Sequence, residues 1–310
     1  MNLEQLRGFA EIAGTGHFTR AAEHLHLAQP SLSRQIAGLE SELGVRLFHR
    51  VRGNVALTVA GERLLPIARR MLADAETARS EMAELVGLSR GRIRLGATPT
   101  LCTSLVAEVL AEFRARYPGI DVEILERGSR SLLEALAEGA FDLALIVTSV
   151  SSGAARAVLE REPILSERLV VVSAAAEPDP FAQGKAVELA ELATVPQIAF
   201  PENYDLRVAM DAAFGAEGLD PIVAVSGAEM DAALRFAERG LGVAVVPAMV
   251  AVDRPTLRSA PLAGADLTRT ISIARRSDMA PSHAGAALQA LIREIADRLA
   301  ATEPELVTRV

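Results

Sequence analysis

The chain has 310 residues, 32 basic and 40 acidic side chains and a formal net charge of −8, and this length suffices for about two ordinary domains. The acidic balance excludes a polycation that binds nucleic acid through charge over its whole surface, although a local basic site remains open. Nine Phe, two Tyr and no Trp make a stacking platform for single-stranded nucleic acid poorly supported.

Cysteine content and hydropathy indicate the compartment. The single cysteine, Cys102, excludes an internal disulfide and fits a reducing compartment. Glu4 and Arg7 stand where a signal peptide would need an apolar run. The longest uncharged apolar stretch, 240–252, contains Pro247 and is shorter than the roughly 18 residues of a spanning helix. We therefore expect a cytoplasmic protein without membrane contact.

Charge is distributed unevenly along the chain. Residues 1–60 hold six Arg and five Glu, a net of +1, so the remaining 250 residues carry −9. The interval 43–61 contains Arg46, His49, Arg50 and Arg52 and no acidic residue. This asymmetry indicates two parts with different partners, the first a polyanion. Taken alone, the basic run fits a solvated surface equally well.

The first 45 residues predict three helices. An apolar series begins at Leu3 and recurs at helical spacing. Thr19 is expected to cap a second helix. Pro30 marks the start of a third, because proline is best tolerated in the first helical turn. The third helix would turn four side chains inward at spacings of 4, 3 and 4: Leu32, Ile36, Leu39 and Leu43.

That inward set leaves polar side chains exposed near the amino-terminal end of the third helix. Hydroxyls, amides and guanidinium groups reach base edges and phosphates in a major groove. A tight uncharged turn joins helices two and three, as a helix-turn-helix requires. Gly53-Asn54 is a hairpin dipeptide and predicts a two-stranded wing that carries the basic run. The exposed helix residues are Gln29, Ser31, Ser33, Arg34 and Gln35.

Three motifs stand out in the amino-terminal 65 residues: Thr19-Arg20-Ala21-Ala22, residues 28–36 (AQPSLSRQI) and residues 43–48 (LGVRLF). Through these motifs the segment resembles the winged helix-turn-helix of LysR-type transcriptional regulators. It implies contact between the third helix and a double-stranded DNA operator, with Arg34 on a phosphate and the wing arginines on the backbone or minor groove. The expected DNA-binding residues are Thr19, Arg20, Gln29, Pro30, Ser31, Ser33, Arg34, Arg50 and Arg52.

A heptad pattern follows the wing. Seven apolar or small residues recur at gaps of 4 and 3, and charged residues lie between them, which is typical of a helix-to-helix seam. A single amphipathic helix packed on its own protein is the alternative. A palindromic operator favours a two-fold dimer, and the family resemblance implies pairing through this linker helix, often into tetramers. The seam residues are Leu64, Ala68, Met71, Ala75, Ala78, Met82 and Leu85.

The remaining chain predicts an α/β domain. Strands over 92–97, 120–125 and 141–147 alternate with helices over 101–117 and 131–137, an order that implies a parallel sheet covered by helices. Further strands are expected over 169–173, 198–200, 222–225, 243–246 and 270–274, and a last helix over 282–300.

Hydroxyl and amide residues gather where these strands end. Parallel sheets bind ligands at the carboxyl ends of their strands, and hydroxyls and amides suit a small anion such as a carboxylate. Any one Ser or Thr is more often simply a helix cap, but five such clusters at one sheet edge favour a ligand cleft. This part of the chain also resembles the periplasmic-binding-protein-like effector domain of the same family, through 91–96, 141–145 and 240–247. The expected effector-binding residues are Thr98, Pro99, Thr100, Leu101, Ser129, Thr148, Asn203, Ser226 and Pro247.

Together these predictions give a mixed α and α/β fold: a winged helix-turn-helix (1–60), a linker helix (61–88) and a two-lobed effector domain (89–310). The resemblance implies the two lobes: lobe 1 would comprise 91–164 and 264–310, and lobe 2 would comprise 165–263, with a chain crossing near 164 and a return near 264.

Motifs of catalysis and of cofactor binding are missing from the sequence. Lys185 is the only lysine, and Asp179 stands where a phosphate-binding loop needs glycine. His24 and His26 point to different faces of a helix, away from shared metal ligation. Cys102 is expected at a helix amino terminus, where the dipole lowers a thiol pKa, but it has no second cysteine for a redox pair.

Three functional classes follow. A ligand-responsive DNA-binding regulator explains the whole chain, and RNA polymerase would be a further partner if it activates. A small-molecule-binding or transport protein explains only residues 90–310, and an enzyme on a binding-protein fold lacks a nucleophile, a metal set or a cofactor loop. Within the first class, a regulator without an effector is the alternative.

Overall fold

The structure is a computed structural model of the chain. It describes all residues except 52–53, 86–90, 149–158, 182–184, 203, 253 and 265–266, and the side chains of 50, 51, 54, 80, 81, 83–85 and 148 also lie outside the description. Among the described residues, no helix is long and apolar enough to cross a membrane.

The amino-terminal part is a winged helix-turn-helix, as expected. The predicted cap is wrong: the second helix begins at Phe18 with His17 as its N-cap, so Thr19 already lies in the first turn. Val55 of the wing donates its N–H to the carbonyl of Gly16 at 3.1 Å. This bond holds the wing against the loop between the first and second helices. The elements are α1 (Leu3–Thr15), α2 (Phe18–His24), α3 (Gln29–Leu43), β1 (Phe48–Val51) and β2 (Asn54–Leu57).

A small aromatic core holds these elements together. The rings of Phe9 and Phe48 lie 5.3 Å apart, and Phe18 contacts Phe48 edge-on at 5.8 Å. Ala68, from the following helix, is 0% exposed and completes the same core. Aromatic contacts of this kind fix the wing to α1 and α2.

The linker helix α4 (Val59–Leu85) begins directly after the wing. Thr58 caps it, because its Oγ1 accepts the N–H of Gly61 at 3.1 Å and donates to the carbonyl of Arg46 at 2.7 Å. The predicted seam is wrong for Ala68, since its side chain belongs to the core of the helix-turn-helix. Met71 and Met82 are exposed, and so is Ile67, which the heptad pattern left out. Ile67, Met71 and Met82 therefore form an exposed apolar stripe along one face of α4.

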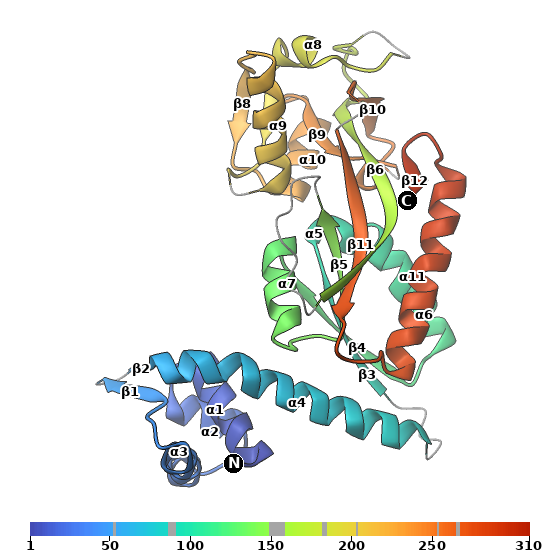
Figure 1. The fold of residues 1–310 in the computed structure, drawn as a ribbon. Coiled ribbons are helices and arrows are strands. Elements are labelled where there is room, and N and C mark those ends of the chain that lie inside the picture. The colour runs from blue at the N-terminus through green and yellow to red at the C-terminus, as the bar shows by residue number, and fades with distance from the viewer. Residues whose placement is uncertain are drawn as a thin grey trace.

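Lobe 1 lies above α4 in Figure 1, with α6 and α11 on one face of its sheet and α7 on the other. Strands β3, β4 and β5 are parallel, as expected, whereas β11 runs antiparallel to β5 and β6. The sheet as a whole is mixed, because the chain leaves the lobe along β6 and returns along β11. The strands are β3 (Gly91–Ala97), β4 (Ile120–Glu126), β5 (Leu143–Thr148), β6 (Leu159–Ala174), β11 (Thr268–Arg276) and β12 (Val307–Arg309). The helices are α5 (Pro99–Cys102), α6 (Leu105–Arg116), α7 (Ser129–Ala137) and α11 (His283–Thr302).

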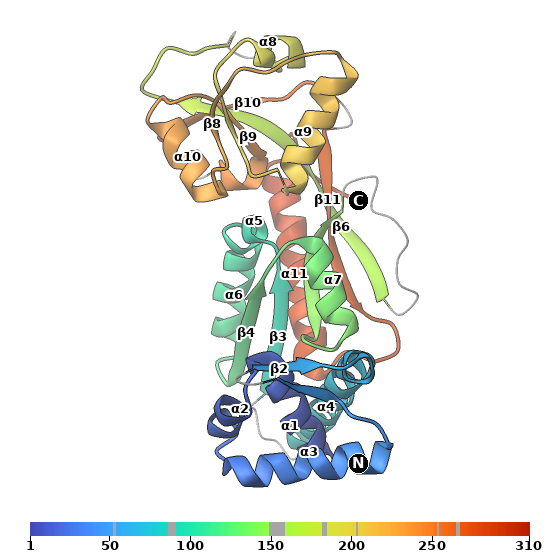
Figure 2. The ribbon, with the colours of Figure 1, turned by 90° about the vertical axis from the view of Figure 1, so that its left-hand side faces the viewer.

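Lobe 2 forms the opposite end of the molecule from the helix-turn-helix (Figures 1 and 2). Its core lies between the far half of β6 and the helices around it. The strands are β7 (Gln197–Ala199), β8 (Val223–Ser226), β9 (Ala244–Pro247) and β10 (Leu257–Pro261). The helices are α8 (Leu189–Ala193), α9 (Asp205–Ala216), α10 (Met230–Glu238) and the 3-10 turn η1 (Ala248–Val250).

Two long strands, β6 and β11, connect the lobes (Figure 2). The first part of β6 pairs with β11 as far as Arg168, opposite Thr268, and from Leu169 it pairs with β9 and β10. The expected strand over 169–173 is thus the end of a 16-residue strand. The change of partner falls a few residues beyond the expected crossing near 164.

Lobe 1 rests on α4. A Cβ on Gly139 would lie 3.1 Å from Cβ of Ala73 and 3.2 Å from Cα of Arg70. Ion pairs flank this contact, one between Arg276 and Asp74 at 2.9 Å and one between Arg69 and Glu138 at 2.6 Å.

Candidate DNA-binding surface and effector site

Helix α3 is seated by its apolar face. Leu32, Ile36 and Leu39 are 0% exposed, which turns the opposite face outward. At Gly8 of α1 a Cβ would lie only 2.6 Å from Cδ1 of Leu32, so glycine permits the close approach of α1 to α3.

Three of the residues predicted to contact DNA lie on the outward face of α3. Gln29, Pro30 and Arg34 are exposed at the start of α3. Arg34 donates from Nε to the carbonyl of Pro30 at 3.3 Å, a bond that does not engage its two terminal nitrogens. Thr19 and Arg20 are exposed on α2, whereas Ser31 and Ser33 are half-buried.

The two wing arginines are described less fully. Arg50 belongs to β1, but its side chain lies outside the described residues, and so does Arg52 altogether. Their predicted phosphate contacts stay predictions.

Glu40 supports the wing, a role that the sequence reasoning missed. Its carboxylate is 7% exposed and accepts the N–H groups of Leu47 and Phe48 at 2.8 and 3.3 Å. Arg46 donates to the other oxygen at 3.2 Å. A glutamate at the polar margin of an amphipathic helix gives no sequence signal for this contact, because the partner is the backbone of a later segment.

Several expected effector residues meet at the end of β3. Thr98 follows the strand and is 7% exposed, and Thr100 is 5% exposed; Pro99 between them is half-buried. Ser129, at the start of α7, is 8% exposed and its Oγ accepts the N–H of Val147 at 3.0 Å. This bond ties α7 to β5.

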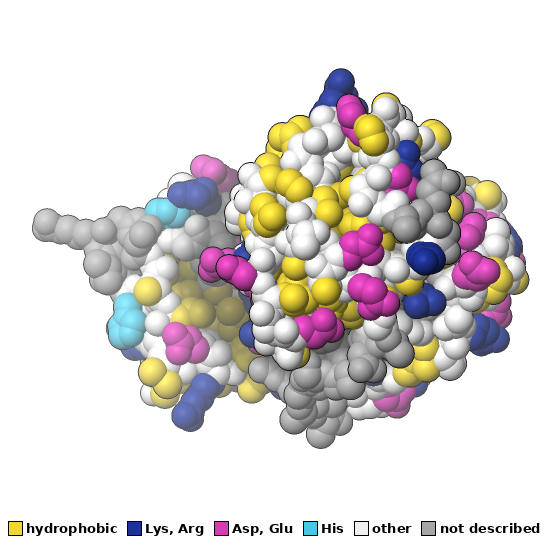
Figure 3. Space-filling view, turned by 90° about the horizontal axis from the view of Figure 1, so that it is seen from above, with side chains coloured by type: hydrophobic (Ala, Val, Ile, Leu, Met, Phe, Trp, Pro, Cys, Tyr) yellow, Lys and Arg dark blue, Asp and Glu magenta, His cyan; other side chains and the backbone are white. Residues whose placement is uncertain are grey.

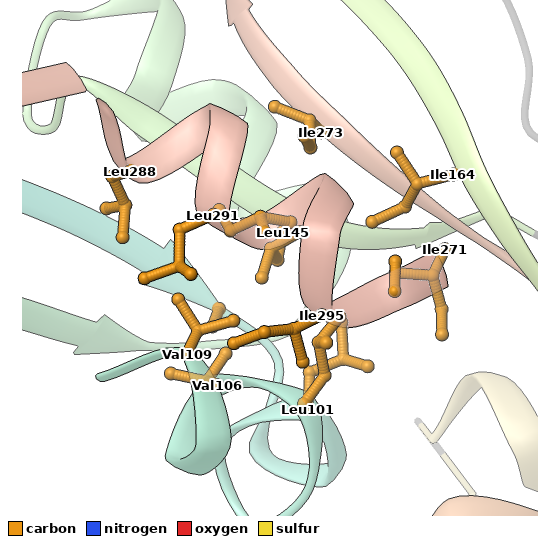
Figure 4. Packing of buried hydrophobic residues seen from close by; sticks show 14 of the residues in the cluster. Leu101, Val106, Val109, Leu145, Ile164, Ile271, Ile273, Leu288, Leu291 and Ile295 are labelled. Carbon is orange, nitrogen blue, oxygen red and sulfur yellow. The ribbon is translucent and has the colours of Figure 1, made fainter. Parts of the chain in front are cut away.

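Other expected effector residues lie elsewhere. Leu101 is 0% exposed and packs beside Ile295 in the core of lobe 1 (Figure 4), so its side chain does not line a cleft, and the prediction for it is wrong. Pro247 is buried at the end of β9, and Ser226 is exposed at the end of β8. Asn203 and the side chain of Thr148 lie outside the described residues.

An ion pair between the crossing strands was not predicted. Glu167 of β6 is 0% exposed and faces Arg269 of β11 directly across the ladder. Oε2 of Glu167 accepts from Nε of Arg269 at 2.6 Å, and Oε1 accepts the N–H of Met249 at 2.6 Å. Nη1 of Arg269 donates to Oγ1 of Thr100 at 2.7 Å. The pair therefore joins the end of β3 in lobe 1 to η1 in lobe 2.

Lobe 2 contributes Tyr204 to the same region. Its ring stacks on Phe200 with centroids 5.4 Å apart. Burial and the carboxylate of Glu229 raise the pKa of Tyr204, while the guanidinium of Arg269 opposes them. Tyr204 and Arg269 thus lie within electrostatic range of each other between the lobes.

In the described part of the chain, no three His, Cys, Asp or Glu side chains group as metal ligands. The region at the end of β3 offers hydroxyls and one guanidinium, which suit an anion.

Comparisons with known proteins match both parts of the chain. Residues 3–62 match the model "Bacterial regulatory helix-turn-helix protein, lysR family", and residues 87–300 match "LysR substrate binding domain". The chain belongs to the LysR family. Its match to the second model covers more than half of the sequence.

Three similar LysR-family proteins illustrate the range. A probable nitrogen assimilation transcriptional activator of Synechococcus elongatus is 32% identical over 88% of each chain. Full-length CbnR in complex with its target DNA is 27% identical, has a TM-score of 0.65, and the match covers 96% of this chain and 99% of CbnR. The BenM effector-binding domain with its effector benzoate is 25% identical with a TM-score of 0.57, over 67% of this chain and 93% of that domain.

As a LysR-family member, the protein is a DNA-binding transcriptional regulator with a substrate-binding domain. Its relatives carry the names of transcriptional regulators rather than of enzymes.

Proposed function

We propose that the protein regulates transcription in the cytoplasm by binding a partly palindromic operator as a dimer, and that a small anionic effector between lobes 1 and 2 changes this binding. The observation that carries the proposed DNA binding is the exposed start of α3, where Gln29 and Arg34 project from a helix whose other face is buried. CbnR in complex with its target DNA supports it by similarity.

The linker helix supports the dimer. Ile67, Met71 and Met82 are exposed on α4, and they lie on one helical face that a second α4 would cover. Exposed apolar side chains of lobe 2, among them Val208, Ile222 and Leu241, suggest a second interface and hence a tetramer. Figure 3 shows apolar side chains gathered on this end of the molecule. If the regulator activates transcription, RNA polymerase is a further partner.

The second part of the proposal, the effector site, is supported by the residues at the end of β3. Thr100 accepts a hydrogen bond from Arg269 there, and Thr98 lies two residues before Thr100, directly after the strand. The BenM domain, whose title names benzoate as its effector, has the same fold. A regulator without an effector is the alternative.

DNA binding is tested by gel-shift titration with the region upstream of the protein's own gene at several salt concentrations. We expect Gln29→Ala to weaken binding by about 1–3 kcal/mol if it contacts a base. Arg34→Ala should lower the slope of log affinity against log salt by about one, because one phosphate contact is lost.

Arg235→Ala, on a lobe 2 surface paired with Glu238, is the matched control and should bind as wild type. Wild-type affinity in both α3 variants would show that the recognition helix is assigned wrongly.

A further inference from the structure

Strand β12 lies against the hinge between the two lobes. It runs beside β6 at the level where lobes 1 and 2 meet (Figure 1). Its register places Val307 opposite Glu167. The carbonyl of Leu306 accepts the N–H of Arg168 at 2.9 Å, and Arg168 is the last residue of β6 that pairs with β11. The segment before β12 therefore contacts β6 where that strand changes partners.

The segment that carries β12 is anchored in lobe 1. It follows α11, and Val307 donates its N–H to the carbonyl of Glu303 at 2.9 Å, which closes a turn after that helix. The side chain of Val307 is 1% exposed and belongs to the core of lobe 1. Arg309 pairs with Asp297 of α11 at 2.9 Å. We call residues 303–309 the strap.

Leu306 extends the strap to lobe 2. Its half-buried side chain packs against the core of lobe 1 and also against the core of lobe 2 that contains Val170 and Val250. Met249 makes the reciprocal contact, because it belongs to η1 of lobe 2 and packs against the core of lobe 1. Two apolar side chains thus bridge the lobes in opposite directions.

These contacts restrain rotation at the hinge. Up to Arg168, strand β6 is flanked by β11 and β12, and beyond it by β9 and β10. If lobe 2 turned about this point, Leu306 would separate from the core of lobe 2, because Val307 keeps the strap on lobe 1. Exposing part of an apolar side chain to water is unfavourable, so the strap opposes the turn.

We propose that the strap is a conformational clamp that holds lobe 2 at one angle to lobe 1, with Leu306 as the residue that transmits the restraint. The clamp goes beyond the proposed function, because it acts on the lobes whether or not DNA or an effector is bound.

Leu306→Ala tests the clamp through amide hydrogen exchange of the full-length protein, followed by mass spectrometry. Peptides over 165–172 report on the hinge, and peptides over 105–116 and 230–238 report on helices of lobes 1 and 2. We expect the hinge amides to exchange about tenfold faster than in the wild type, the scale set by part of one leucine side chain. The helix peptides should keep their wild-type rates.

Leu299→Ala is the matched control. Leu299 is a half-buried leucine of α11 that packs against the core of lobe 1, so its truncation removes similar apolar area without touching the bridge. Hinge exchange in this variant should equal that of the wild type.

A reversible cross-link gives the opposite test. Thr308 lies opposite Ser166 of β6, and Cα atoms of such pairs are about 4.5–5.5 Å apart, within the range that a disulfide spans. We expect Ser166→Cys with Thr308→Cys, in a Cys102→Ser background, to exchange more slowly at the hinge when oxidised than when reduced.

The rotation itself is measured by the distance between spin labels on Glu134→Cys of α7 and Glu191→Cys of α8, two exposed positions in different lobes. Cys102→Ser removes the native thiol, and an excess of unlabelled chain restricts the measurement to distances within one chain. We expect a narrow distribution with Leu306 present and a broader one with Leu306→Ala.

Four results would overturn the proposal: wild-type hinge exchange in Leu306→Ala, equal acceleration of the hinge and helix peptides, hinge exchange that the cross-link leaves unchanged, or an unchanged distance distribution. None of these measurements involves DNA or an effector, so they leave the proposed function untouched.

Discussion

At Cys102 the local environment opposes thiol reactivity. The residue ends the four-residue helix α5 and packs against the core of lobe 1. Burial, with a contribution from the carboxylate of Glu126, raises its pKa to about 11. The expectation that a helix dipole lowers this pKa is wrong, because the thiol is at the carboxyl end of a short helix and is partly removed from water.

Labelling with iodoacetamide tests this environment. The thiolate is the reactive form, and a raised pKa leaves it scarce near neutral pH. The rate in the folded protein should therefore be far below that of a free thiol, whose pKa is about 8.5, and should rise until about pH 11. Denaturant should restore the rate of a free thiol. Fast labelling of the folded protein at neutral pH, or an oxidant response in operator binding that Cys102→Ser removes, would contradict this account.

Sequence reasoning succeeded where one element decides a residue's position. The burial period of Leu32, Ile36 and Leu39 sufficed to place Gln29 and Arg34 on the outside of α3. It failed for Glu167 and Arg269, whose contact depends on the register of two strands about a hundred residues apart. It also failed for Leu101, because a residue that follows a strand can turn either to the cleft or to the core.

The junction between the wing and α4 depends on a close backbone approach. A Cβ on Gly61 would lie 2.3 Å from the carbonyl oxygen of Leu47 and 2.8 Å from Cδ2 of Leu57. The backbone of Leu47 is also held by the N–H of Thr58 at 2.9 Å, so it cannot easily move away. Only glycine fits at this point of the first turn of α4.

Gly61→Ala should therefore lower the free energy of unfolding by about 1–3 kcal/mol, the usual cost of overpacking, and should weaken DNA binding through the displaced wing. Gly14→Ala is the matched control: it lies within α1 with no atom near the added Cβ, and alanine should stabilise that helix by up to about 1 kcal/mol. Urea denaturation measures both. Equal stability of the two variants would mean that the junction tolerates a side chain.

The linker helix shows the same limit of sequence reasoning at the level of an element. Its existence followed from the heptads, but different faces of α4 have different surroundings. Ala68 packs on the DNA-binding core, Ala73 contacts Gly139 of lobe 1, and Met71 and Met82 are exposed. A repeat of small and apolar residues does not reveal how such a helix divides its contacts.

For the molecule as a whole, the described contacts between the DNA-binding and effector parts include two ion pairs beside Gly139. Arg276 is 9% exposed and bonds Asp74 of α4 as well as Asp278 of its own lobe, and Asp278 is the larger cause of its raised pKa. Removing Asp74 therefore leaves no unpaired buried charge. Partly exposed pairs contribute less than about 1 kcal/mol each, so they orient the parts more than they stabilise them.

The double variant Asp74→Asn with Glu138→Gln should unfold at nearly the wild-type temperature but show a larger radius of gyration by small-angle X-ray scattering. High salt should increase the radius of gyration more in the wild type than in the double variant, because only the wild type has these ion pairs to screen. Glu76→Gln, which breaks an ion pair within α4, should change neither quantity. Identical scattering profiles for wild type and the double variant would show that apolar contact at Gly139 alone sets the arrangement.

The crossing of β6 and β11 also bears on how such a molecule can diversify. Arg168 and Thr268, the last residues paired before the chain enters and after it leaves lobe 2, face each other across one ladder, about 5 Å apart. A short hairpin turn could join them and leave the sheet of lobe 1 closed. Lobe 2 is therefore an insertion whose two ends lie next to each other. Recombination at these two positions could replace it with a lobe that lines a different ligand site and leave the DNA-binding part unchanged.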